Sequence, residues 1–414
     1  MLDIKYIREN VELVERSTKD KGYSVNIVEL LSLDDKRRNL ITDIDTLREQ
    51  RNMLASQMKG GKPTDEIIGQ GKEVKAKIAE LEAQFSDIDT RFQKLLNSVP
   101  NVFSEDTPVG EESEFTVKSE WGERKSSAVD HLDFAAKRDW VDFERGAKVA
   151  GNKFYYLKGD LAKLQVALLS YGLQKISEAG FTFMDIPYVV NERISNGTGF
   201  TPRSDKQSDT YFIEGEDLSL IGTAEVSLTG YHADEIIDEK NLPLLYAGYS
   251  PCFRKEAGAA GKHNRGLFRV HQFNKLEMYA FSTLEKSAEI HEKIREIEES
   301  IWRELKIPYR VINIPSKDLG APAWKKYDIE YWSPVDGAYR ELTSCSNCTD
   351  YQARSLNIRV RRSDSGKVET LHTLNGTAIS MARTLVAIIE NFQDDDKLQI
   401  PEVLQKFMNN QKEI

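Results

Sequence analysis

The chain contains 414 residues, a length that predicts two domains, one of them large. Hydrophobic residues make up 40% and charged residues 30%, a balance typical of a globular protein in water, and no apolar run of about 18 residues predicts a membrane span. A net charge of −10 argues against a general nucleic-acid binder and against DNA as a partner, but it leaves room for a local RNA contact, because recognition depends on where the charges lie.

The cysteines and the first residues indicate the compartment. Three cysteines in a chain of this length favour reducing surroundings over a disulfide-linked scaffold. The opening Met-Leu-Asp-Ile-Lys lacks the basic and then apolar layout of a secretory signal. We therefore expect a cytoplasmic protein.

A long helical hairpin is predicted near the N-terminus. Leucines recur every seven residues, as a helix that packs along one seam requires: Leu33, Leu40, Leu47 and Leu54. Ile44 and Met58 occupy alternate positions of this seam, and Arg37 and Arg51 also fall on it. In a second run the apolar spacing alternates between four and three, as a coiled-coil seam requires. The apolar positions of that run are Val74, Ile78, Leu81, Phe85, Ile88, Phe92, Leu95 and Val99. A Gly-Gly-Lys-Pro turn at residues 60–63 separates the runs and favours an antiparallel hairpin, with an intermolecular coiled coil or a structural spacer as the alternative.

The charges of this arm do not reveal its ligand. At about 35 residues and ~1.5 Å per residue, the second helix forms a rod of roughly 50 Å. Between residues 33 and 100 acidic and basic residues are equal in number, so the arm is neutral overall. Toward the turn the balance becomes basic, through Arg48, Arg51, Lys59 and Lys62.

The segment after the arm reads as a linker into a second domain. Pro100 and Pro108 end the helix, so we place the boundary near residues 100–115 and expect domains at residues 1–103 and 104–414. His131 has no metal-like partners nearby in sequence, so we interpret it as a structural or surface histidine. The apolar spacing at residues 161–179 predicts an amphipathic helix, and residues 181–187 read as a strand that reaches a proline.

The stretch at residues 251–273 carries the strongest signal. Two apolar, strand-like runs flank a loop rich in glycine and basic residues, and alternation along a strand would place Arg254 and Glu256 on one face. Glycines and cations in the loop at residues 257–266 would let backbone and charge approach a polyphosphate. From the pattern alone, an ordinary hairpin with a charged face is the other interpretation.

Cys345 and Cys348 form a Cys-x-x-Cys pair that suggests zinc or redox chemistry. A structural zinc site needs four ligands, and Cys252 lies far away in sequence. We therefore expect no zinc and interpret the pair as strand packing.

Three segments of the chain together resemble a known family. Phe-Arg-x-Glu at residues 253–256, followed by a loop and then Arg269-x-x-x-Phe273, resembles the second signature motif of class II aminoacyl-tRNA synthetases, and the wording through Glu277 is similar to the seryl-tRNA synthetase branch. The helix, glycine, strand and proline at residues 161–187 resemble the first motif. Residues 371–391 resemble the third, a strand, a glycine and a helix that carries Arg383.

This resemblance implies an α+β fold in which a class II antiparallel β-sheet with flanking helices follows the coiled-coil hairpin. It implies a homodimer that joins L-serine to ATP as seryl-adenylate, releases pyrophosphate, and transfers serine to tRNA(Ser), and also to tRNA(Sec) where the organism has one. The arm would grip the long variable arm of tRNA, with contacts expected from its basic tip. That tip comprises Arg48, Arg51, Lys59 and Lys62.

The resemblance also implies two groups of site residues, with Arg254, Glu277 and Arg383 as the catalytic ones. The expected serine-binding residues are Thr223, Ala224, Glu225, Arg254, Glu277, Asn375 and Thr377. The expected ATP-binding residues are Arg254, Lys255, Glu256, Val270, Phe273, Glu341, Leu342, Thr343, Ser344 and Arg383. Glu341 and Ser344 would also hold Mg²⁺, which prefers hard oxygen ligands.

The third motif departs from the usual wording of the family. Ala378 and Ala382 stand where glycines are common, and Thr377 where serine is usual, so each position carries one additional methyl group. Two other functions remain as alternatives: an inactive paralogue kept as an RNA-binding or structural protein, and a relative that passes an activated amino acid to a carrier protein. The charged motif residues argue against the first, and the retained arm argues against the second.

Overall fold

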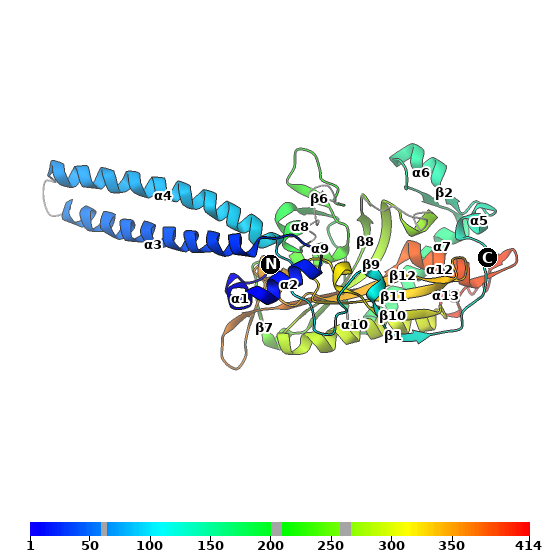
Figure 1. Cartoon of the computed structure of the whole chain (residues 1–414). Helices are drawn as coiled ribbons and strands as arrows, with labels where there is room; N and C mark the ends of the chain where they lie inside the picture. The colour runs from blue at the N-terminus through cyan, green and yellow to red at the C-terminus, as the bar shows by residue number, and fades with distance from the viewer. Residues whose placement is uncertain (59–63, 200–208, 257–265) are drawn as a thin grey trace. The chain divides into compact units, whose positions relative to one another are not determined.

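The computed structural model describes residues 1–58, 64–199, 209–256 and 266–414, and the chain divides into two compact units (Figure 1). One unit comprises residues 2–19 and 23–100, and the other comprises residues 1, 20–22 and 101–414. Lys59, Lys62 and the loop at residues 257–265 lie outside the described residues. No helix in the described part of the chain is long and apolar enough to cross a membrane.

The first unit is helical. It contains α1 (Ile4–Glu9), α2 (Val11–Asp20), α3 (Ile27–Met58) and α4 (Asp65–Ser98). The predicted antiparallel hairpin is formed by α3 and α4, which lie side by side (Figure 1). Thr64 caps the N-terminus of α4 by accepting a hydrogen bond from the backbone N–H of Ile67, so the second helix begins directly after the predicted turn.

Part of the predicted seam is buried between the two helices, and most of its other apolar positions are partly buried. The buried positions are Leu33, Ile44, Leu54, Val74, Ile78 and Phe92. At the base of α4 the structure differs from the prediction, because Leu96 is buried and Leu95 only partly so. Leu95 and Leu96 follow Phe92 by three and four residues, and both spacings keep a side chain on the same helical face. The spacing alone could therefore not predict which of the two leucines is buried.

Arg37 lies on the seam between the helices, and its charge is paired. Its guanidinium lies over the ring of Phe92, 4.5 Å from the centroid, and pairs with Asp34 at 3.2 Å and Asp89 at 3.4 Å. Asp34 is buried and also binds Arg8 at 2.7 Å. The stacking and the ion pairs together allow a cation at an otherwise apolar position.

The second unit is built on an eight-stranded sheet with the order β1-β10-β11-β12-β15-β9-β8-β4. The strands are β1 (Thr116–Trp121), β4 (Thr182–Met184), β8 (Leu244–Phe253), β9 (Gln272–Ser282), β10 (Tyr309–Asn313), β11 (Lys325–Ser333), β12 (Ala338–Asn347) and β15 (His372–Ser380). Neighbouring strands are antiparallel except β4, which pairs parallel with β8. The expected mixed α+β fold with a large antiparallel sheet is confirmed.

The two faces of this sheet differ. Three helices contribute to the main hydrophobic core on one face: α7 (Gly159–Glu178), α10 (Leu284–Glu304) and α12 (Met381–Phe392). Leu276 and Met278 of β9 point into that core, so the alternating Lys275 and Glu277 point to the opposite face. The polar groups that could bind a substrate gather on this second face.

Shorter elements complete the unit. The remaining helices are α5 (His131–Ala136), α6 (Phe143–Ala150), α8 (Glu192–Gly197), α9 (Ala224–Gly230), α11 (Tyr351–Ser355) and α13 (Glu402–Gln405). The remaining strands are β2 (Val141–Asp142), β3 (Tyr156–Leu157), β5 (Val189–Asn191), β6 (Leu218–Leu220), β7 (Ile236–Asp238), β13 (Arg359–Arg361), β14 (Val368–Thr370), β16 (Gln393–Asp394) and β17 (Lys397–Leu398).

Candidate active site

The hairpin of β8 and β9 brings the two halves of residues 251–273 together. Cys252 pairs with Phe273, so the loop between the strands leaves and returns at one edge of the sheet. The predicted alternation of Arg254 and Glu256 along a strand is wrong, because β8 ends at Phe253 and Glu256 has a φ of 49°, in the left-handed region. The two side chains are instead held by individual contacts.

Each charged residue beside this loop has a defined partner. Arg254 donates from Nε to the carbonyl of Gly222 at 3.2 Å, and its guanidinium lies 5.4 Å from the centroid of the Phe273 ring. Glu256 pairs with Arg269 at 3.1 Å. Arg254 is thereby tied to the segment that leads into Thr223, so the predicted phosphate-binding and serine-binding residues adjoin.

The returning end of the loop is anchored by His131, which is buried in α5. Its Nε2 accepts a hydrogen bond from the backbone N–H of Leu267 at 3.4 Å, and its Nδ1 lies 3.4 Å from Glu390 of α12. Glu390 also accepts hydrogen bonds from Tyr331 and Ser333. His131 is therefore a structural histidine that links the loop to the helix carrying Arg383.

A second arginine meets a carboxylate on the neighbouring strands. Arg383 pairs with Glu341 at 3.0 Å, and its guanidinium lies 4.9 Å from the centroid of the Phe268 ring. Partial burial raises the pKa of Glu341, but Arg383, Lys326 and Arg254 outweigh this effect and bring that pKa to about 2. Glu341 is therefore ionised at neutral pH and lies among three cations.

The four residues 341–344 divide between the two faces of the sheet. A bulge opposite β11 places Leu342 in the main core, and Thr343 bonds there to Glu298 at 2.8 Å. Glu341 and Ser344 face the other side, where Ser344 lies opposite Asp328. Only the main chain of Leu342 and Thr343 is therefore available for contact with a nucleotide on the polar face.

The predicted serine-binding residues gather around two buried carboxylates. Glu225 lies at the start of α9, where Thr223 caps the helix by accepting from the Glu225 backbone N–H at 3.3 Å. Glu277 lies on β9 and accepts from Thr377 of β15 at 3.4 Å. The buried members of this group are Thr223, Ala224, Glu225, Glu277, Asn375 and Thr377.

The pKa of Glu225 is raised to about 7. Burial is the main cause and the charge of Glu277 adds to it, whereas a hydrogen bond from Gln352, the charge of Lys275 and a hydrogen bond from Asn375 oppose the shift. The carboxyl group is therefore balanced between its neutral and ionised forms near neutral pH. A cation brought beside it would favour the ionised form.

Lys275 belongs to this buried cluster, although the sequence did not single it out. It is buried and forms an ion pair with Glu277, two residues along the same strand. The signal was present, because residues i and i+2 of a strand share a face and a buried glutamate needs a partner.

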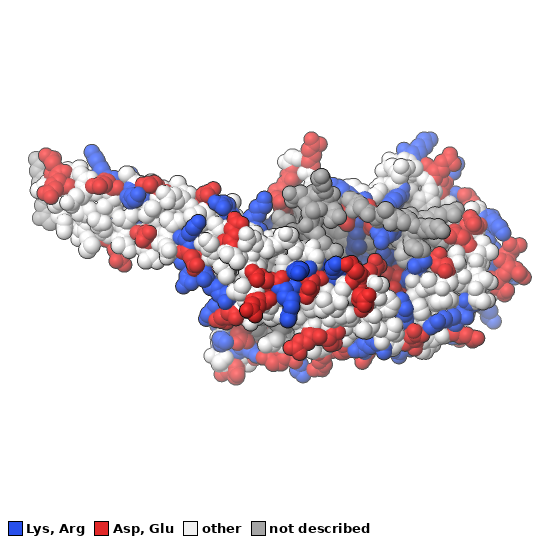
Figure 2. All heavy atoms as spheres, viewed as in Figure 1, with Lys and Arg blue, Asp and Glu red and all other residues white. Residues whose placement is uncertain are grey.

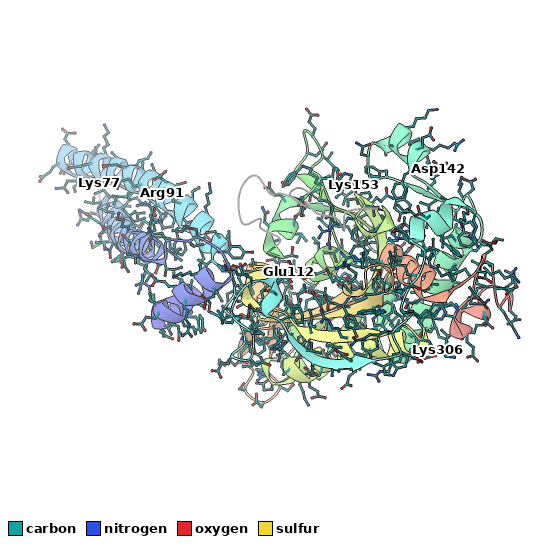
Figure 3. The ribbon with its side chains drawn as sticks, turned by 45° about the vertical axis from the view of Figure 1, so that its right-hand side comes forward. Lys77, Arg91, Glu112, Asp142, Lys153 and Lys306 are labelled. Atoms are coloured by element: carbon teal, nitrogen blue, oxygen red, sulfur yellow. The ribbon has the colours of Figure 1, made fainter. Side chains whose placement is uncertain are left out.

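The remaining predicted residues are placed as follows. The ammonium of Lys255 lies 5.6 Å from the centroid of the Tyr211 ring. Val270 is buried, and the backbone N–H of the adjacent His271 binds the carbonyl of Lys153, which Figure 3 labels. Ala378 and Ala382 both lie in the main core, so their additional methyl groups pack against apolar side chains.

The cysteines and the described residues of the arm tip complete the account. Cys252, Cys345 and Cys348 are free and buried, and the described residues contain no cluster of three or more His, Cys, Asp or Glu side chains suited to a metal. Acidic and basic side chains are interspersed along the visible face of the arm (Figure 2). Arg48 pairs with Glu82 at 2.9 Å and Asp45 at 3.2 Å, whereas Arg51 is exposed.

Comparisons with known proteins agree along the whole chain. The family model "Seryl-tRNA synthetase N-terminal domain" matches residues 1–103, and "tRNA synthetase class II core domain (G, H, P, S and T)" matches residues 210–392. The serine–tRNA ligase of Dictyoglomus turgidum is 45% identical over 420 residues, which cover 99% of this chain and 98% of that protein. The serine–tRNA ligase of Treponema denticola is 43% identical over 418 residues, or 98% of each chain.

Solved structures show the same likeness. The seryl-tRNA synthetase from Pyrococcus horikoshii complexed with ATP has a TM-score of 0.90 and 41% identity, covering 100% of this chain and 99% of its own. The cytoplasmic serine–tRNA ligase from Naegleria fowleri in complex with AMP has a TM-score of 0.85 and 31% identity, covering 100% of this chain and 98% of its own.

Proposed function

The chain belongs to the seryl-tRNA synthetase family, and from this premise we propose which residues carry each part of its reaction. The chain is a serine–tRNA ligase that uses ATP. In its first step the serine carboxylate attacks the α-phosphorus of ATP, a C–O–P linkage forms, and pyrophosphate leaves. In its second step a terminal hydroxyl of tRNA attacks the carbonyl carbon of the adenylate, an ester bond to serine forms, and AMP and a proton leave.

Serine binds at the two buried carboxylates. Glu225 pairs with its ammonium group, supported by the Thr223 hydroxyl, and Glu277 accepts a hydrogen bond from its hydroxyl. Alanine would leave Glu277 without that donor in a buried site, a cost that provides discrimination. Asn375 and Thr377 border this pocket.

ATP binds along the polar face beside the loop. Arg254 neutralises the α-phosphate and the serine carboxylate, and Arg383 neutralises the γ-phosphate. Glu256 accepts from the adenine amino group and Phe273 stacks on the ring. Charge neutralisation and positioning are the main catalytic contributions, because the substrate carboxylate is itself the nucleophile and needs no general base.

The residues present fit a magnesium ion. Glu341 is ionised and Ser344 shares its face, so both offer hard oxygen ligands, and Mg²⁺ commonly takes few protein ligands and completes its shell with phosphate and water. When bound there, the ion would neutralise charge on the phosphates. Glu341 would then exchange part of its contact with Arg383 for the metal, leaving the guanidinium for phosphate.

One observation carries this assignment. Arg254 and Arg383 lie in different motifs, yet Arg383 pairs with Glu341 at 3.0 Å and the charge of Arg254 also lowers the pKa of that carboxyl. Glu277 lies on the same face of the sheet, near Glu225 of α9. An anion site and a site for a small zwitterion with a hydroxyl therefore adjoin. Nothing in the described residues favours the inactive paralogue.

The first test is ATP–pyrophosphate exchange without tRNA, with serine, alanine, threonine and cysteine in parallel. Exchange that depends on serine supports the assignment of the pocket. If alanine supported exchange as fast as serine does, the proposed role of Glu277 would be refuted. If folded protein showed no exchange with any of these amino acids, the inactive paralogue would become the leading hypothesis.

The partners beyond serine, ATP and tRNA are also part of this proposal. The arm binds the long variable arm of tRNA(Ser), and tRNA(Sec) shares that feature where the organism has one. The chain forms a homodimer through the region of α7 and β4, where Val166 and Phe183 are exposed apolar side chains. Three free cysteines and a role in protein synthesis support a cytoplasmic location.

A further inference from the structure

Gln352 lies at the centre of a hydrogen-bond network beneath the serine pocket. It belongs to α11 and is fully buried. Its Nε2 donates to the carboxylate of Glu225 at 2.7 Å and to the carbonyl of Thr198 at 3.0 Å. Its Oε1 accepts from the hydroxyl of Tyr279 at 3.1 Å and from that of Thr373 at 2.7 Å.

These four bonds give the amide one orientation. Two N–H groups meet two acceptors, and one carbonyl oxygen meets two hydroxyl donors, which uses the whole capacity of a glutamine side chain. Rotation of the amide by 180° would place its oxygen against Glu225 and against the Thr198 carbonyl. Tyr279 and Thr373 therefore ensure that Gln352 presents a donor to Glu225.

A donor at this position favours the ionised carboxylate. Glu225 is buried near Glu277, and both features oppose its charge, while the Gln352 amide, the charge of Lys275 and the Asn375 amide support it. The other titratable groups near Glu225 are the Tyr279 hydroxyl and the Cys348 thiol, both of which are buried. The amide also restricts the direction of the Glu225 carboxylate, because the hydrogen bond from Gln352 opposes rotation of that group.

We propose that Gln352 is a positioning residue for the amino-acid pocket, which favours the ionised form of Glu225 and aims its carboxylate at the ammonium group of serine. This inference rests on the proposed role of Glu225. It makes the recognition of serine depend on a residue of α11 that follows Cys348 by four positions and belongs to none of the three motifs.

The sharpest test is Gln352→Glu, which keeps the shape of the side chain. The new carboxylate still accepts from Tyr279 and Thr373, but its other oxygen faces Glu225 and the Thr198 carbonyl, so the two carboxyl groups share one proton and Glu225 loses its fixed amide donor. In ATP–pyrophosphate exchange we expect the KM for serine to rise about 10- to 100-fold, the range for loss of an interaction with a charged group. The KM for ATP should stay within about twofold, since the nucleotide residues are untouched.

A second variant tests the same proposal in case Gln352→Glu does not fold. Tyr279→Phe combined with Thr373→Val retains Gln352 but removes both hydroxyls that orient its amide. We expect a rise of about 3- to 10-fold in the KM for serine, with the KM for ATP unchanged. A purely structural role would lower the unfolding temperature and kcat without separating the two KM values.

The outcomes separate this inference from the assignment on which it depends. If the wild-type enzyme shows no serine-dependent exchange, the proposed function fails. If Glu225→Gln leaves the KM for serine unchanged, the role of Glu225 fails and the inference with it. If Glu225→Gln raises that KM but neither Gln352→Glu nor the double variant does, the role of Gln352 alone is overturned.

Discussion

Arg383 of α12 and Glu341 of β12 form an ion pair of 3.0 Å on the polar face of the sheet. The side chain of Glu341 is 42% exposed, so this pair stands at the edge of the site and is open to a ligand. The carboxylate of Glu341 neutralises the charge of Arg383 in this pair. Under the proposed assignment, the pair holds Arg383 in position until a phosphate competes for it.

Arg383→Ala should lower the rate of ATP–pyrophosphate exchange by about 10²- to 10³-fold, because it removes a preorganised cation from the phosphate site. The KM for ATP should rise as well, whereas serine binding should change little. Arg145→Ala is a matched control, because Arg145 is largely exposed and pairs with Asp142 at 2.7 Å. Near-normal exchange in Arg383→Ala would refute the phosphate assignment.

The pH dependence of serine recognition follows from Glu225, whose pKa lies at about 7. Below that value the carboxyl group is mostly neutral and pairs poorly with an ammonium group, so the KM for serine should fall as the pH rises from about 6 to about 8. The KM for ATP should stay flat, because the pKa of Glu341 is about 2 and its charge does not change in this range. A flat serine profile would show that Glu225 does not carry the interaction.

The same shift has a consequence for stability. The folded pKa of Glu225 is raised above the ordinary value of 4.5, so the folded state retains a proton that the unfolded state releases. Stability from this group is present below about pH 4.5 and declines until about pH 7, by on the order of 3 kcal/mol for the free enzyme. Glu225→Gln should remove that decline, as urea unfolding at about pH 5 and pH 8 would measure.

His131 should be important for the loop and for α12 together. His131→Ala removes the acceptor for the Leu267 N–H and leaves Glu390 without its nearby imidazole, so we expect a loss of about 1–3 kcal/mol in unfolding free energy. The KM for ATP should rise more than the KM for serine, since the anchored segment leads to Arg269 and Phe273. An unchanged KM for ATP with lowered stability would limit His131 to a packing role.

The sequence predicted the features that depend on local pattern. The heptad spacing predicted the hairpin of α3 and α4, and the two apolar runs around residues 257–266 predicted the pairing of β8 with β9. The site residues were predicted from the motif sequences, which indicate the chemistry of a family but not the geometry of its site. The alternation of Arg254 and Glu256 failed because nothing local reveals that a strand ends at Phe253.

Partners that meet through the tertiary fold left no comparable signal. Gln352 reaches Glu225 across 127 positions, and His131 reaches Leu267 across 136. Such contacts depend on which strands become neighbours, as β15 does with both β12 and β9. A lone glutamine or histidine in sequence does not identify the residue that will complete its hydrogen bonds.

Gly376→Ala should destabilise the catalytic unit. A methyl group at this position would lie 2.2 Å from Cγ2 of Ile294 and 2.6 Å from Oε1 of Glu298, so α10 would have to move away from β15. We expect a cost of about 1–3 kcal/mol, measured by chemical unfolding. Gly69→Ala is the control, because nothing lies within 4 Å and alanine favours the helix, so that change should be neutral or slightly stabilising.

The arm offers a test in which two neighbouring arginines should differ. Arg48 already pairs with Glu82 and Asp45, so its charge is largely compensated, whereas Arg51 is exposed and pairs with none of the described residues. Arg51→Ala should therefore raise the KM for tRNA more than Arg48→Ala, and should reduce the slope of log affinity against log salt by about 0.7 to 0.9, the contribution of one phosphate contact.

The control is the reaction that does not involve tRNA. Neither substitution should alter ATP–pyrophosphate exchange with serine, because the arm and the sheet are separate compact units. Deletion of residues 40–90, closed by a short glycine linker, should likewise spare exchange but remove charging of tRNA. Full charging of tRNA by the deletion variant would refute the role of the arm. If Arg48→Ala and Arg51→Ala raised the KM for tRNA equally, ion pairing within the arm would not determine which arginine contacts the RNA.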